Sequence, residues 1–133
     1  MEHICELRRG LETAFINQSF HSNLAYRPEF ISNDYKQGKR VISSIEQELM
    51  NCDGFFISVA FITLGGLTPL LQILSELEQK DIKGKILTTD YLAFSDPVAL
   101  DRLHSLKNIE LKMFCSNDDK DGFHTKGYIF RKE

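Results

Sequence analysis

The segment of greatest chemical interest runs from residue 122 to residue 130 and contains a histidine and a lysine two positions apart, His124 and Lys126. The segment is apolar enough to predict a strand, and residues two apart on a strand project from the same face. The two side chains should therefore lie next to each other, on a face that Tyr128 and Phe130 continue. An imidazole beside an ammonium is unusual on a core strand, because both groups are costly to bury without a partner.

This pair suits chemistry on a phosphate group. A lysine binds phosphoryl oxygens and neutralises their charge as a point charge. A histidine can attack phosphorus or move a proton, since imidazole gains and loses protons near neutral pH. The sequence therefore predicts a phosphate site at His124 and Lys126. The alternative is an exposed strand that carries two ordinary polar residues, because so short a motif also occurs by chance.

Two further residues, Asp90 and Thr63, are candidates for binding a substrate at the same site. Asp90 ends a predicted strand, where α/β sheets place their ligands. An aspartate there commonly caps the next turn, and we favour that role. Thr63 follows another predicted strand and either lines the pocket or is an ordinary strand residue. Gly65 and Gly66 favour a tight turn over an anion site, because the lysine of a phosphate-binding loop is absent.

No metal site is expected. His3 and Cys5 could begin one, but no second pair of ligands follows them. The cluster of Asp118, Asp119 and Asp121 lacks the spacing and the terminal glutamate of a calcium loop, so a solvated acidic loop is the better interpretation.

Composition favours an ordinary globular domain. The 133 residues are 42% hydrophobic and 26% charged, with a net charge of −3, so any nucleic-acid site must be local. The 3 cysteines show neither a disulfide framework nor a zinc pair, which favours a reducing, cytoplasmic compartment. Apolar runs fall short of the ~20 residues of a membrane span, so no membrane partner is expected. Three basic clusters, near residues 8–9, 36–40 and 80–85, are candidate contacts for DNA, although interleaved acidic residues favour solvated surfaces.

The elements that must position these residues follow from hydrophobic periodicity. We expect a helix over residues 3–17, an irregular segment to residue 37, and a second helix from about residue 41 to 49. A strand at residues 55–62 reads as covered on both faces. A third helix should be capped by Thr68 and begin at Pro69. Further along the chain we expect a strand at 85–89, a helix that begins at residues 95–97 and a strand at 109–115. An exposed acidic loop at 116–122 then precedes the strand that carries His124 and Lys126.

Strands that alternate with helices predict an α/β fold, a mixed, mostly parallel sheet with helices on both faces. The loop at 116–122 is too short for a crossover helix, so the last two strands are antiparallel neighbours or sit apart in the sheet. We expect an N-terminal helix and irregular packed segment at residues 1–37 and the α/β domain at residues 38–133, the two forming one compact unit.

The tripeptide His124-Thr125-Lys126, on a strand after alternating strands and helices, resembles the H-x-K half-motif of the phospholipase D superfamily. Residues 17–20, 24–28, 58–63, 84–91 and 123–130 also look like the phospholipase D-like domain at the N-terminus of certain bacterial DEAD/DEAH-box helicases. The resemblance extends from about residue 14 to the end of the chain.

The resemblance implies a metal-independent mechanism. In that superfamily two H-x-K motifs meet across a two-fold axis. One histidine attacks the phosphodiester and becomes phosphohistidine, and the other protonates the leaving oxygen and then activates water. This chain has a single copy of the motif, so a homodimer would complete the site. His124 would be the nucleophile in one subunit and the general acid in the other, with Lys126 as the phosphate ligand in both.

The sequence departs from the superfamily pattern in two places. The aspartate that follows the lysine in the full motif is replaced by Arg131, and the G-S-x-N segment would fall beyond Glu133. We therefore expect a fragment of a longer chain with a helicase domain, inactive by itself. No cofactor is expected in this domain, with ATP and magnesium required only if a helicase motor follows.

Three functions remain open from the sequence. The first is a nuclease-type phosphodiesterase of a helicase-related protein, with DNA a better substrate than RNA. The second is a non-catalytic module that binds DNA or mediates assembly of a helicase. The third, transfer of a lipid headgroup, is disfavoured because no basic amphipathic helix stands out.

Overall fold

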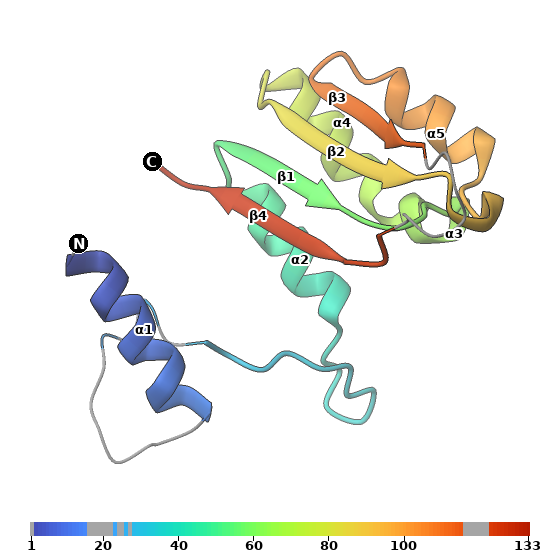
Figure 1. Ribbon diagram of the computed structural model, residues 1–133. Helices are drawn as coiled ribbons and strands as arrows, with labels where there is room; N and C mark the ends of the chain where they lie inside the picture. The colour runs from blue at the N-terminus through green and yellow to red at the C-terminus, as the bar shows by residue number, and fades with distance from the viewer. Residues whose placement is uncertain (1, 16–22, 24–25, 27, 116–122) are drawn as a thin grey trace. The chain divides into compact units, whose positions relative to one another are not determined.

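A computed structural model describes residues 2–15, 23, 26, 28–115 and 123–133 (Figure 1). The chain forms two compact units, residues 1–41 and residues 42–133, and each is described by itself. None of the helices in these described ranges is long and apolar enough to cross a membrane.

The first unit contains helix α1 (Glu2–Phe15), which confirms the N-terminal helix expected from periodicity. The Tyr26 hydroxyl lies 3.3 Å from Nδ1 of His3 and connects the following segment to the start of this helix. Asp34 and Lys39 exchange backbone hydrogen bonds of 2.8 and 2.9 Å around a tight turn. Gly38 has a φ of 69° in that turn, a conformation that glycine adopts without a steric cost.

The second unit is built on a sheet of 4 strands in the order β3-β2-β1-β4 (Figure 1). The parallel strands are β1 (Gly54–Ser58), β2 (Gly84–Thr89) and β3 (Ile109–Phe114), and the antiparallel strand is β4 (Gly127–Arg131). The predicted α/β fold with a mixed, mostly parallel sheet is confirmed. The last two strands sit apart, because β4 pairs with β1 at the opposite edge from β3.

One face of this sheet packs against the helices α2 (Val41–Met50), α4 (Leu71–Gln79) and α5 (Pro97–His104) (Figure 1). Buried side chains of all three helices join those of the strands in one core: Leu49, Leu74, Leu77, Leu103, Phe55, Ile57 and Ile86. The expectation of helices on both faces is therefore wrong for residues 42–133. The connections from β1 to β2 and from β2 to β3 both move toward the same edge of the sheet. Because parallel crossovers share one hand, both connections place their helices on the same face.

The opposite face of the sheet exposes apolar and charged side chains. Phe56 is 47% exposed and Ile129 is 65% exposed, so β1 is not covered on both faces as its apolar run suggested. Lys112 and Lys85 contact the Glu110 carboxylate at 2.8 and 3.2 Å, and these hydrogen bonds lower the pKa of Glu110. Exposed ion pairs of this kind contribute little stability.

The chain between β1 and β2 also differs from expectation. Strand β1 ends at Ser58, and residues 59–63 continue without regular structure. The glycine pair forms part of a short helix, and helical structure continues as α3 (Leu64–Leu67), a 3-10 turn (Thr68–Leu70) and α4. Thr63 is the residue that caps, since its Oγ1 accepts a hydrogen bond of 3.2 Å from the Gly66 backbone N–H. The hydroxyl of Thr68 instead donates to the Leu64 carbonyl at 2.7 Å.

Helix α5 begins as its sequence predicts. The Asp96 carboxylate accepts a hydrogen bond of 2.8 Å from the Val98 backbone N–H, and Pro97 occupies the first turn. We expect Asp96→Ala to lower the free energy of unfolding by about 1 kcal/mol, because an N–H at the helix start loses its acceptor. Urea denaturation would measure this, with the exposed Asp101→Ala in the same helix as the control. Equal losses in both variants would contradict the capping role.

Candidate functional site

The His-Lys pair lies at the carboxyl edge of the parallel strands. Residues 123–126 have no regular secondary structure and lead directly into β4, so the pair precedes the strand on which it was expected. Gly127 begins β4 and pairs with Ser58, the last residue of β1. The antiparallel direction of β4 therefore brings residues 124 and 126 to the edge where α/β sheets bind ligands.

The two side chains lie together, as their spacing predicts. Nζ of Lys126 is 3.4 Å from Nε2 of His124, and both residues are exposed. The same Nζ lies 5.7 Å from the ring centroid of Phe61, a distance typical of a cation-π contact. In the described part of the chain no carboxylate forms an ion pair with Lys126. Within those described residues, its positive charge is not offset by a carboxylate.

A cavity of about 250 Å³ opens beside the pair. Tyr128 in β4 and Lys126, the residue just before that strand, line this cavity. Thr63, the residue that caps α3, lines it as well. The remaining lining is mostly apolar, with Ile57, Leu74 and Leu103 among its residues. Phe130 packs against the core beyond it, so Lys126, Tyr128 and Phe130 share the face that alternation predicts. The structure therefore brings Thr63 and Lys126 to one cavity, although the hydroxyl of Thr63 also caps α3.

Asp90 lies next to the site. It follows β2 and precedes a short 3-10 turn, η3 (Tyr91–Ala93), but its side chain makes no capping hydrogen bond to that turn. The capping role that we favoured from the sequence is therefore wrong. Its backbone N–H donates to the Phe114 carbonyl at 3.2 Å, which ties the end of β2 to β3. The ring of the next residue, Tyr91, contacts His124.

Three aromatic residues at this edge were not predicted to take part in the site. We define the ring cluster as Phe61, Tyr91 and Phe94. His124 lies 6.1 Å from Phe61 and 5.7 Å from Tyr91, measured between ring centroids. Phe94 lies 5.7 Å from Phe61 and 6.1 Å from Tyr91. The sequence held a partial signal, because Tyr91 and Phe94 follow the predicted strand at 85–89. Phe61 was placed inside the predicted strand at 55–62, and only the structure shows that β1 ends before it, at Ser58.

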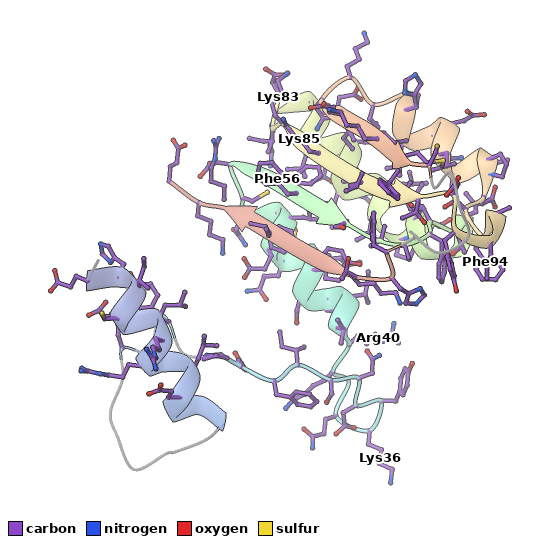
Figure 2. All side chains as sticks on the ribbon, viewed as in Figure 1. Lys36, Arg40, Phe56, Lys83, Lys85 and Phe94 are labelled. Carbon is purple, nitrogen blue, oxygen red and sulfur yellow. The ribbon has the colours of Figure 1, made fainter. Side chains whose placement is uncertain are left out.

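Other positions have structural roles. Arg131 lies in β4 and donates from Nη2 to the Asp53 carbonyl at 3.3 Å. Figure 2 shows Lys83 and Lys85, and these pair with Asp81 at 2.6 Å and with Glu110 at 3.2 Å. That cluster is accordingly a solvated charged surface. Two stretches singled out in the sequence lie outside the described residues. They are residues 17–20, where the sequence resembles the phospholipase D-like domain, and the acidic cluster at residues 118–121.

The His-Lys pair is therefore an exposed, basic site at the carboxyl edge of a mostly parallel α/β sheet. Neither a scan against models of known protein families nor a search of curated proteins found a match to this chain. Among the residues with described positions, no group of three or more His, Cys, Asp or Glu side chains could hold a metal ion.

Proposed function

We propose that this chain is a phospholipase D-like phosphodiesterase domain that acts on nucleic acid. The observation that supports it most is the 3.4 Å approach of the Lys126 ammonium to the His124 imidazole, with no paired carboxylate in the described residues. A lysine without an acidic partner favours binding of an anion, and phosphate is the anion that a lysine binds as a point charge. The adjacent histidine is within reach of a phosphate held there.

The reaction would proceed in two balanced steps. Nε2 of His124 attacks phosphorus, a P–N bond forms, and the P–O bond to the leaving oxygen breaks as that oxygen takes a proton from a second histidine. The second histidine then removes a proton from water, whose oxygen attacks phosphorus and breaks the P–N bond. Lys126 neutralises the phosphoryl oxygens in both steps.

The second histidine would come from another copy of the same chain. The sequence contains one H-x-K motif, and His124 and Lys126 are both exposed, so a copy can approach them. A homodimer with a two-fold axis beside this edge would join two such pairs into one site. We further propose association with a helicase in a reducing, cytoplasmic compartment, which the free thiols of Cys5, Cys52 and Cys115 support.

A second function is a non-catalytic module that binds DNA or mediates assembly of a helicase. The observation that favours it is Arg131, which stands where the catalytic motif has an aspartate and which hydrogen-bonds to the turn before β1. Such a module would use Lys126 for phosphate and require no attack by His124.

Hydrolysis in the presence of EDTA tests these functions. The longest natural chain that contains these 133 residues should hydrolyse bis(p-nitrophenyl) phosphate and DNA in EDTA. Lys126→Ala should lower kcat/KM by about 10²-fold or more, because a charge on the transition state loses its partner. The control Lys80→Ala removes an exposed lysine after α4, before the amino end of β2, and should leave hydrolysis unchanged.

The outcomes separate the two functions. An acid-labile phosphorylated protein, trapped during turnover, would support the histidine intermediate. No hydrolysis, together with salt-dependent DNA binding that Lys126→Ala weakens, would support the binding module instead. Equal effects of the Lys126 and Lys80 substitutions on binding would contradict a local phosphate site.

A further inference from the structure

The ring cluster and the basic pair together point to one class of ligand. We propose that Phe94, supported by Phe61 and Tyr91, stacks on a base of a single-stranded nucleic acid whose phosphate is bound by Lys126 beside His124. This inference rests on the proposed function and names its substrate class. A ligand for this edge needs an aromatic ring and a phosphate close together, and a nucleotide of an unpaired strand has both.

Phe94 packs against two aromatic neighbours and remains accessible. Its ring meets Phe61 at an interplanar angle of 81° and Tyr91 at 78°, so both neighbours support it in edge-to-face contacts. Phe94 is nevertheless 52% exposed. Phe61 and Tyr91 are both partly buried and both contact His124, so Phe94 is connected to the basic pair through these two rings. An exposed, well-supported aromatic ring beside a cation is the arrangement on which bases stack in single-strand binding sites.

The backbone that presents Phe94 is unusual. Leu92 has a φ of 48° and Ala93 a φ of 53°, the left-handed conformation that residues with a Cβ rarely adopt. The turn is closed by the Phe94 backbone N–H, which donates to the Tyr91 carbonyl at 3.1 Å. It is anchored at its start by the Tyr91 N–H, which donates to Oγ1 of the buried Thr89 at 2.9 Å. Strained backbone of this kind is found where a structure must hold a side chain for function.

The arrangement favours a single strand over a duplex and over a lipid. In a duplex the bases stack on one another, so their faces are not available to a protein ring without extrusion. A single strand offers both faces of each base and its phosphates. A lipid phosphodiester has no ring to stack. The exposed Leu92, 63% accessible, would enter a membrane together with Phe94, whereas stacking uses the aromatic ring alone.

Equilibrium binding of fluorescent oligonucleotides tests the proposal with the natural chain. The probes are a single strand, the same sequence as a duplex, and an abasic strand with the same number of phosphates. The variants are Phe94→Ala, Phe94→Leu, Phe94→Tyr, Leu92→Ala and Lys126→Ala. Phe94→Leu retains apolar volume, so its binding loss cannot be attributed to a failure to fold, and a matched circular dichroism spectrum confirms this for each variant.

We expect the single strand to bind more tightly than the duplex or the abasic strand. Phe94→Ala and Phe94→Leu should weaken single-strand binding by about tenfold, within the range that base stacking on aromatic residues supplies. Both should leave binding of the abasic strand unchanged, and Phe94→Tyr should bind as the natural chain does. Leu92→Ala should have no effect. Lys126→Ala should weaken binding of all three probes.

The proposal is overturned if Phe94→Ala binds the single strand normally, or if the abasic strand binds as tightly as the strand with bases. Loss of abasic-strand binding in Lys126→Ala would still support the phosphate site in that case, so the two failures are distinguishable. Binding to phosphatidylglycerol vesicles that Phe94→Ala and Leu92→Ala weaken equally would overturn stacking in favour of a membrane surface.

Discussion

His124→Ala should abolish the metal-independent hydrolysis of phosphodiesters and leave DNA binding close to normal. The imidazole is proposed to form the bond to phosphorus, and loss of a covalent nucleophile lowers kcat by about 10³-fold to 10⁶-fold in other hydrolases. Lys126, the phosphate ligand, is untouched by the change. His124 is exposed, so the substitution should change the free energy of unfolding by less than about 1 kcal/mol. Initial rates in EDTA, beside binding of labelled DNA and a urea denaturation curve, would separate these effects.

The matched control is His104→Ala. His104 is an exposed histidine at the end of α5, outside the segment that carries the His-Lys pair, and hydrolysis should not depend on it. Activity that persists in purified His124→Ala would identify a contaminating enzyme and remove the role assigned to this residue. Loss of activity in both histidine variants would point to a general effect on folding.

Phe55→Ala should destabilise the protein by about 3–5 kcal/mol, the usual cost of removing a buried aromatic side chain. Phe55 is 1% exposed in the core between the sheet and its helices. Its ring lies against Gly84 of β2, where an added Cβ would overlap the ring. Because Phe55 packs this closely on Gly84, Gly84→Ala should also destabilise the protein, by about 1–3 kcal/mol.

The adjacent Phe56 provides the control for Phe55. It belongs to the same strand, points to the opposite face and is 47% exposed, so Phe56→Ala should cost less than about 1.5 kcal/mol. Urea denaturation of the two variants measures the difference. Equal losses would show that the face carrying Phe56 is covered in solution, and the assignment of one buried face would then be wrong. If Phe55→Ala does not fold, Phe55→Leu retains most of the volume and keeps the comparison measurable.

Much of the fold is predictable because local signals agree with the tertiary structure. Periodicity places helices α1, α2 and α5 and strand β2 close to their observed positions. Capping rules likewise agree with the cap by Asp96 before Pro97. The spacing of His124 and Lys126 predicted side chains that lie together, and they do lie together, with Nζ 3.4 Å from Nε2, although both residues precede the strand.

Only the tertiary structure decided which surfaces are buried and which residues meet. Phe55 and Phe56 are chemically identical neighbours, and their burial differs because the helices of both crossovers lie on one face of the sheet. The ring cluster assembles from residues 61, 91 and 94 because parallel strands end at one edge, and β4 brings His124 there from more than 25 positions further along the chain. Residue types and spacing thus predicted the chemistry of the pair, whereas its aromatic surroundings depend on strand order, which no local pattern specifies.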